Sequence, residues 1–250
     1  MKQIVNYFPK TDTDNSVTIT TTTADTNFKT DNLKSIKPSK VWKSTDITET
    51  IVKYDFGVDV TYNAMFLNRF NFAKFYVETS TDDSTWTLVE EVSNLNTDEV
   101  SDENYMHRFV DITGTYRYIR VRIPAQTPLF EPTYFKIGNM LVGDAITIWN
   151  PRSGFSVTQI PKLALFEFKS GHISVEKVGK TRRSFSGSFD KVKKEEFDKI
   201  IKTYNPFVIY QEFDNDKTSC YLVRVTKEFV KDYYQANTLN MSFSFEEIVW

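Results

Sequence analysis

The chain has 250 residues, 40% of them hydrophobic and 15% aromatic, and a formal net charge of −2 at pH 7. A chain this aromatic can bury a substantial core, which excludes wholesale disorder. The charge balance gives no electrostatic basis for binding nucleic acid, and no apolar run of about 18 residues is present to span a membrane.

Cysteine and histidine are scarce. Cys220 is the only cysteine, so no intrachain disulfide can form, and the histidines are His107 and His172. These are too few ligands for a zinc-type site, and neither histidine has a neighbouring catalytic motif. No glycine-rich phosphate loop occurs. We therefore expect no cofactor, no metal and no enzymatic activity.

The first half of the chain alternates β-favouring runs with polar turns. A Thr-rich run at residues 16–23 predicts an edge strand, with an exposed adhesive arm as the alternative. Residues 51–56 form a further run, and Gly57 is expected to end it because glycine adopts positive φ freely. Runs at 62–70 and 75–79 follow, then a polar turn before Trp86. This spacing predicts an antiparallel sandwich or barrel.

Strands are also predicted at residues 88–92, 106–111 and 116–123. In the last of these, alternation places Ile119, Val121 and Ile123 on the inner face and Tyr118, Arg120 and Arg122 on the outer face. The two outward arginines either grip an anionic ligand or keep the surface soluble.

The segment 93–104 is polar and acidic, with carboxylates at Asp98, Glu99, Asp102 and Glu103. Clustered oxygen ligands suit calcium, but the spacing does not match a helix–loop–helix calcium loop. We expect a solvated loop.

Three aromatic residues in predicted loops are candidate ligand-binding platforms: Phe28, Trp42 and Phe72. Each of the three also suits a core position, because large aromatic side chains dominate core burial.

The β pattern is interrupted at residues 144–162 and resumes at 163. One α-helix is predicted at about 190–204, capped by Asp190, with one apolar stripe of Phe197, Ile200, Ile201 and Tyr204. Strands at 207–213 and 220–227 follow, and a period-two pattern at 239–246 predicts a last strand with one buried face. We predict two domains, 1–145 and 146–250.

The first domain resembles a discoidin-like (galactose-binding-like) jelly roll. The matching segments, in the expected order, are Asp31-Asn32-Leu33, Val41-Trp42-Lys43-Ser44, Tyr54-Asp55-Phe56-Gly57, Ala64-Met65-Phe66-Leu67, 77–86, Tyr116-Arg117-Tyr118-Ile119-Arg120 and 137–143. The fold class implied is mostly β: a discoidin-like jelly-roll sandwich followed by a smaller β unit with one flanking α-helix.

The whole chain resembles structural proteins of tailed bacteriophages. The C-terminal segments that carry this resemblance are Arg182-Arg183-Ser184-Phe185-Ser186-Gly187-Ser188-Phe189, 207–210, 221–224 and 241–247, and the order of elements resembles tail-tube and distal-tail folds.

The resemblance implies a virion protein of the tail tip or baseplate, made in the host bacterial cytoplasm, that assembles with copies of itself and other tail proteins. The alternative is a glycan-binding module for host-surface attachment, carried on the virion. Both hypotheses use no catalytic chemistry.

Overall fold

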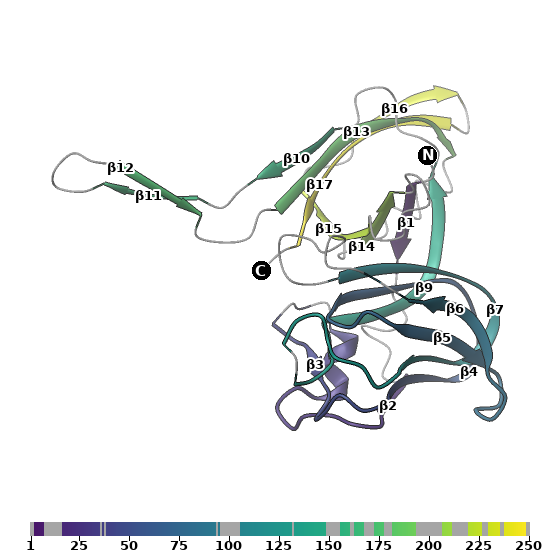
Figure 1. The fold of residues 1–250 in the computed structure, drawn as a ribbon. Helices are drawn as coiled ribbons and strands as arrows, with labels where there is room; N and C mark the ends of the chain where they lie inside the picture. The colour runs from purple at the N-terminus through teal and green to yellow at the C-terminus, as the bar shows by residue number, and fades with distance from the viewer. Residues whose placement is uncertain are drawn as a thin grey trace. The chain divides into compact units, whose positions relative to one another are not determined.

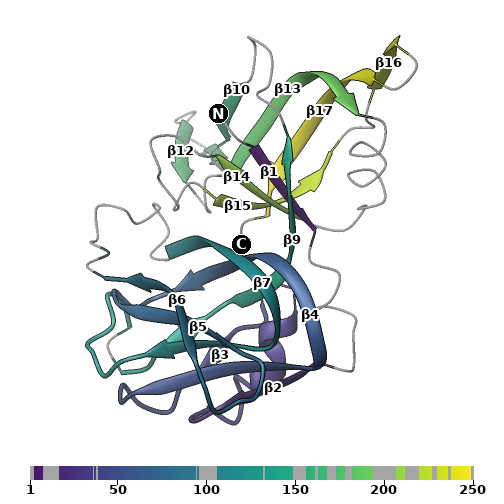
Figure 2. The same cartoon turned by 90° about the vertical axis from the view of Figure 1, so that its right-hand side faces the viewer.

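The computed structural model (Figures 1 and 2) describes residues 3–7, 17–35, 37, 39–93, 95, 106–131, 133–148, 156–160, 163–167, 173–177, 182–193, 207–211, 220–226, 230–235 and 238–248. The chain divides into two compact units. The jelly-roll unit comprises Asn6–Ala145 and Glu212–Cys220, and the C-terminal unit comprises Met1–Val5, Ile146–Gln211 and Tyr221–Trp250. The division predicted at residue 145 differs from this grouping in the two short segments 1–5 and 212–220.

Strands dominate the described residues, and the one helical element among them is a short 3-10 helix, η1 (Thr30–Lys34). The predicted mostly-β fold class is confirmed. The strands of the jelly-roll unit are β2 (Thr18–Thr21), β3 (Trp42–Lys43), β4 (Thr50–Phe70), β5 (Phe75–Ser80), β6 (Thr87–Val92), β7 (Met106–Ile123), β8 (Lys136–Ile137) and the greater part of β9 (Asn139–Ile148).

The main sheet of this unit runs in the order β9–β4–β7–β5–β6, and its paired strands are antiparallel. β2 pairs with the first part of β4 and with no other described strand, which confirms the predicted edge strand. β3 and β8 form a second, two-stranded sheet. Side chains of both sheets meet in one core, so the unit is a sandwich, as the jelly-roll prediction required.

Two long strands, β4 and β7, pair along almost their full lengths. The prediction that Gly57 ends a strand is wrong, because β4 continues through it. The register shifts between Asp55 and Val60, and Gly57 takes a φ of 74° there. An irregularity of this kind bends a strand without ending it. β7 likewise joins two predicted strands into one across Gly114.

The core is rich in aromatic side chains, as the composition predicted. Ile119, Val121 and Ile123 are fully buried, which confirms the inward face of β7. Phe72 packs edge-to-face against Phe75 and Phe135, with ring centroids 5.6 and 5.9 Å apart. Such contacts add to the stabilisation that comes from removing the rings from water.

The C-terminal unit contains β10 (Ser156–Ile160), β11 (Leu163–Glu167), β12 (Ile173–Lys177), β13 (Arg182–Lys193), β14 (Phe207–Gln211), β15 (Cys220–Val225), β16 (Val230–Gln235) and β17 (Thr238–Glu247), with β1 (Gln3–Tyr7) beginning the chain. β10, β13, β17 and β15 are neighbours in that order, β16 pairs with β17, and β11 pairs with β12. Phe243 and Phe245 are buried and Ser242 is exposed, in agreement with the predicted alternation.

The predicted α-helix at 190–204 is not confirmed. Residues 190–193 belong to β13, where Val192 and Lys193 pair with β17. Strand pairing therefore overrides the capping signal of Asp190. The remainder of the predicted helix, 194–204, lies outside the described residues.

Trp42 provides a direct test of this core. Its side chain is fully buried, and truncating a buried tryptophan costs about 3–5 kcal/mol. We expect Trp42→Ala to lower the free energy of unfolding by that amount in chemical denaturation. Leu88→Ala is the control, because Leu88 is 52% exposed and its truncation should change stability by less than about 0.5 kcal/mol. Equal stability of the two variants would contradict the assigned core.

Candidate functional site

The turn between β5 and β6 is held by its own side chains. Asp82 Oδ1 accepts hydrogen bonds from the backbone N–H groups of Ser84 and Thr85, at 2.9 and 2.8 Å. These bonds, the one from Thr85 foremost, hold the pKa of Asp82 well below its ordinary value. Asp83 adopts a φ of 62°, a conformation that aspartate tolerates better than most residues. The turn thereby fixes the position of Trp86, which follows it.

Trp86 is half-buried against the outer face of the main sheet. The guanidinium of Arg120, on β7, lies over its indole ring with 3.9 Å between the guanidinium carbon and the ring centroid. Tyr118, two residues earlier on the same face, is 6.4 Å from Trp86 between ring centroids. Tyr118 faces outward as predicted, yet is only 8% exposed because these neighbours cover it.

One carboxylate, that of Glu78 on β5, holds both outward arginines of β7. Arg120 Nε donates to Glu78 Oε2 at 2.6 Å, and Arg122 Nη2 donates to Glu78 Oε1 at 3.1 Å. Burial alone would raise the pKa of Glu78, but these hydrogen bonds outweigh it and the pKa is lowered. The sequence left two roles open for the outward arginines, binding an anionic ligand or keeping the surface soluble. Neither describes Arg122 well, because it is hydrogen-bonded to Glu78 and its guanidinium carbon lies 4.2 Å from the ring centroid of Tyr76.

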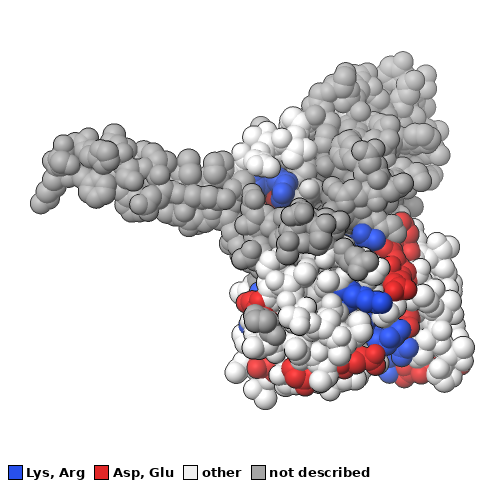
Figure 3. Space-filling view, in the orientation of Figure 1, with Lys and Arg blue, Asp and Glu red and all other residues white. Residues whose placement is uncertain are grey.

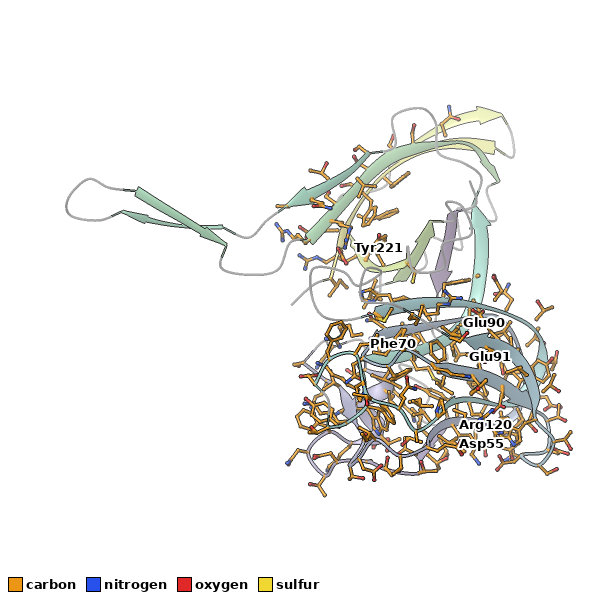
Figure 4. The ribbon with its side chains drawn as sticks, viewed as in Figure 1. Asp55, Phe70, Glu90, Glu91, Arg120 and Tyr221 are labelled. Carbon is orange, nitrogen blue, oxygen red and sulfur yellow. The ribbon has the colours of Figure 1, made fainter. Side chains whose placement is uncertain are left out.

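Lys53, on β4, is the cross-strand neighbour of Arg120. Its ammonium group forms an ion pair with Asp83 at 2.5 Å, which ties the β5–β6 turn to β4. Basic and acidic side chains are interleaved over the visible face of this unit (Figure 3), and Asp55 and Arg120 are labelled on it in Figure 4. Ion pairs among them include Lys53–Asp83, Arg117–Asp55 and Arg120–Glu78.

Lys53, Asp83, Trp86 and Arg120 border an open cleft of about 240 Å³. Its lining consists of Thr20, Thr21, Thr22, Ile51, Lys53, Asp83, Trp86 and Arg120. The cleft thus combines an aromatic ring, hydroxyl groups, two cationic donors and one carboxylate acceptor. Its volume is below the roughly 300–1,000 Å³ of pockets for drug-sized ligands, so it suits a ligand group the size of one sugar ring.

The three aromatic residues proposed from the sequence lie elsewhere. Trp42 and Phe72 are fully buried in the core, where neither offers a ring face to a ligand. Phe28 is half-buried, with the Lys43 ammonium 4.3 Å from its ring centroid. The same ammonium lies 4.1 Å from the ring centroid of Tyr134 and donates to its hydroxyl. A ligand role for Phe28 stays a prediction.

Sequence reasoning did not select Trp86, Lys53 or Asp83. A usable signal existed for Trp86, because it directly follows a polar turn. No local pattern could show that Lys53 would lie beside Arg120, since that neighbourhood depends on the register between β4 and β7.

Two further expectations concern metals and membranes. Among the described residues, no group of three or more His, Cys, Asp or Glu side chains is arranged to hold a metal ion, and the acidic segment around Asp98 lies outside them. Within the same residues, no helix has the length and apolarity needed to cross a membrane.

No protein-family model and no curated protein sequence matches the chain. Among solved structures, it is similar to chitosan-binding module 1 of a chitosanase/glucanase from Paenibacillus sp. IK-5, with 15% identity, a TM-score of 0.45, and coverage of 55% of this chain and 98% of that one.

Two other solved structures are similar to this chain. CpGH89CBM32-5 from Clostridium perfringens, in complex with GalNAc-β-1,3-galactose, has 10% identity, a TM-score of 0.43, and coverage of 55% of this chain and 99% of that one. A Ruminococcus gnavus GH29 fucosidase in complex with fucose has 16% identity, a TM-score of 0.45, and coverage of 56% and 28%. The tail role stays a prediction.

The ion pairs between Glu78 and the two arginines predict that the stability of the fold depends on pH. Because the folded pKa of Glu78 lies below its ordinary value of 4.5, ionised Glu78 stabilises the fold above that pH. This contribution is lost as the pH falls through the lowered folded pKa. We expect Glu78→Gln to cost about 1–3 kcal/mol at pH 7, since partial exposure weakens the pair, and the difference from wild type to shrink below pH 4.

Urea denaturation of both proteins between pH 3 and pH 7 measures this difference. Glu91→Gln is the matched control, because the Glu91 pair with Lys74 is far more exposed, with side chains 45% and 40% accessible. A Glu78→Gln penalty that does not change with pH would contradict the assigned ion pairs.

Proposed function

We propose that the jelly-roll unit binds carbohydrate in the cleft beside Trp86. The observation that carries this proposal is the composition of the cleft wall: one half-exposed indole surrounded by hydroxyl, cationic and carboxylate groups. A sugar ring has apolar C–H faces that stack on aromatic rings and hydroxyl groups that both donate and accept hydrogen bonds. The cleft offers partners for each of these features.

Four of the cleft side chains have assigned roles in this proposal. Trp86 presents an apolar surface to the sugar ring. Lys53 and Arg120 donate hydrogen bonds to sugar oxygens, and Asp83 accepts them from sugar hydroxyls. Because these side chains project from paired strands and a braced turn, their positions are largely fixed before the ligand arrives. Such preorganisation lowers the entropic cost of binding.

The role of the whole chain in a bacteriophage tail rests on the sequence resemblance alone. A glycan-binding unit is compatible with that role, since a virion protein that recognises host-surface glycan needs such a site. We therefore retain the tail role, with its proposed self-assembly and tail-protein partners, as a prediction for which electron microscopy of purified virions is the test.

Removal of the indole tests the carbohydrate site. We expect the full chain to bind at least one saccharide in a panel of neutral, amino and acidic oligosaccharides, measured by isothermal titration calorimetry. Trp86→Ala should weaken that binding at least about tenfold, because tryptophan side chains that a partner covers are among the largest contributors to binding energy. Tyr76→Ala is the matched control: it also removes a ring stacked under an arginine, but Tyr76 does not line the cleft.

Circular dichroism and thermal unfolding must first show that both variants are folded. Wild-type protein that binds no saccharide at millimolar concentration would contradict the proposed function. A Trp86→Ala variant that binds as tightly as Tyr76→Ala would contradict the assignment of the site.

A further inference from the structure

The cleft wall brings two positive charges side by side. Lys53 and Arg120 are direct cross-strand partners on β4 and β7, and Glu78 is the partner of Arg120 on β5. Like charges in directly opposed positions of a sheet destabilise it. Asp83, paired with Lys53, and Glu78, paired with Arg120, compensate part of this repulsion.

Within the cleft itself the compensation is incomplete. Glu78 serves Arg122 as well as Arg120, and Glu49, whose side chain is 56% exposed, approaches Arg122 at 3.7 Å. Lys53, Arg120 and Arg122 are thus paired with three carboxylates in all, of which only that of Asp83 lines the cleft. The part of the cluster that lines the cleft therefore has two cations and one carboxylate.

Arg120 also has hydrogen-bond donors that Glu78 does not use. Its Nε is its hydrogen-bond donor to Glu78, and within the described part of the chain its two Nη groups have no hydrogen-bond partner. The guanidinium is held in place by the indole beneath it and by Glu78 beside it, and its side chain is 18% exposed. A guanidinium with two oriented, unused Nη groups matches the geometry of a carboxylate or of another oxyanion.

From this geometry we infer that the preferred ligand is a saccharide bearing an anionic group, which Arg120 and Lys53 bind together. The inference rests on the proposed function and specifies its ligand class. The anionic group accepts hydrogen bonds from the Arg120 Nη groups and the Lys53 ammonium, while the sugar ring lies against Trp86. A sugar carboxylate and a sulfate ester share this chemistry, and the experiment below distinguishes them.

Asp83 is the one acidic side chain of the cleft wall, and it opposes an anionic ligand. Asp83→Asn removes that charge, and asparagine tolerates the φ of 62° at this position. We expect this variant to raise the ratio of acidic to neutral saccharide affinity about fivefold at low salt, the effect of one charge a few ångströms away in a largely aqueous setting. Glu91→Gln makes the same change in net charge away from the cleft and should leave that ratio unaltered.

The experiment uses the full chain and three matched ligands: an oligosaccharide of hexuronic acid, the same oligosaccharide after carboxyl reduction, and a sulfated neutral oligosaccharide. Affinities are measured by titration calorimetry at 20 and 200 mM salt. We expect the carboxylated ligand, the sulfated ligand or both to bind at least tenfold more tightly than the reduced one, with an advantage that shrinks at the higher salt concentration. Which of the two binds identifies the anionic group.

Arg120→Lys is the second variant, because it keeps the charge and loses the planar fork of donors. It should reduce the preference for the acidic ligand at least threefold, whereas Glu91→Gln should not. Equal binding of the acidic and reduced ligands would overturn this inference and leave the carbohydrate site standing. Absence of binding to all three ligands and to the wider saccharide panel would overturn the proposed function itself.

Discussion

Glu78 is a single carboxylate, only 10% exposed, that holds two arginines on the outer face of a sheet. Without them, an ionised carboxylate at this position would lose much of its hydration and gain little in return. With them, Arg120 is fixed over Trp86 and Arg122 over Tyr76. The aromatic rings, the cations and the cleft beside them all depend on this arrangement.

The same strands form the core and the cleft, because successive side chains of a strand point to opposite faces. On β4, Val52 and Tyr54 are buried in the core while Lys53 between them reaches the cleft. On β7, Ile119 and Val121 flank Arg120 in the same way. A site built on paired strands is positioned more precisely than one built on loops alone.

Much of the jelly-roll unit could be predicted from the sequence, because alternation and turn residues are local signals. The inward face of β7 and the edge position of β2 are examples. Two features could not be predicted. Gly57 is typical of a strand end, although it lies at an irregularity within one strand. Asp190 is a helix-capping residue by type, although the residues that follow it belong to β13 and pair with β17. Of the candidate site, alternation indicated only Arg120, as an outward arginine that either grips an anionic ligand or keeps the surface soluble. Lys53 and Glu78 were missed because register, which is a non-local property, brings them beside Arg120.

NMR of the indole N–H groups during a saccharide titration shows whether a saccharide binds in the cleft. The chain has four tryptophans, and Trp42 is fully buried in the core, so it provides an internal reference. If a saccharide occupies the cleft, the Trp86 signal shifts in a saturable manner while the Trp42 signal does not. A saturable titration that leaves the Trp86 signal unmoved would contradict binding in the cleft.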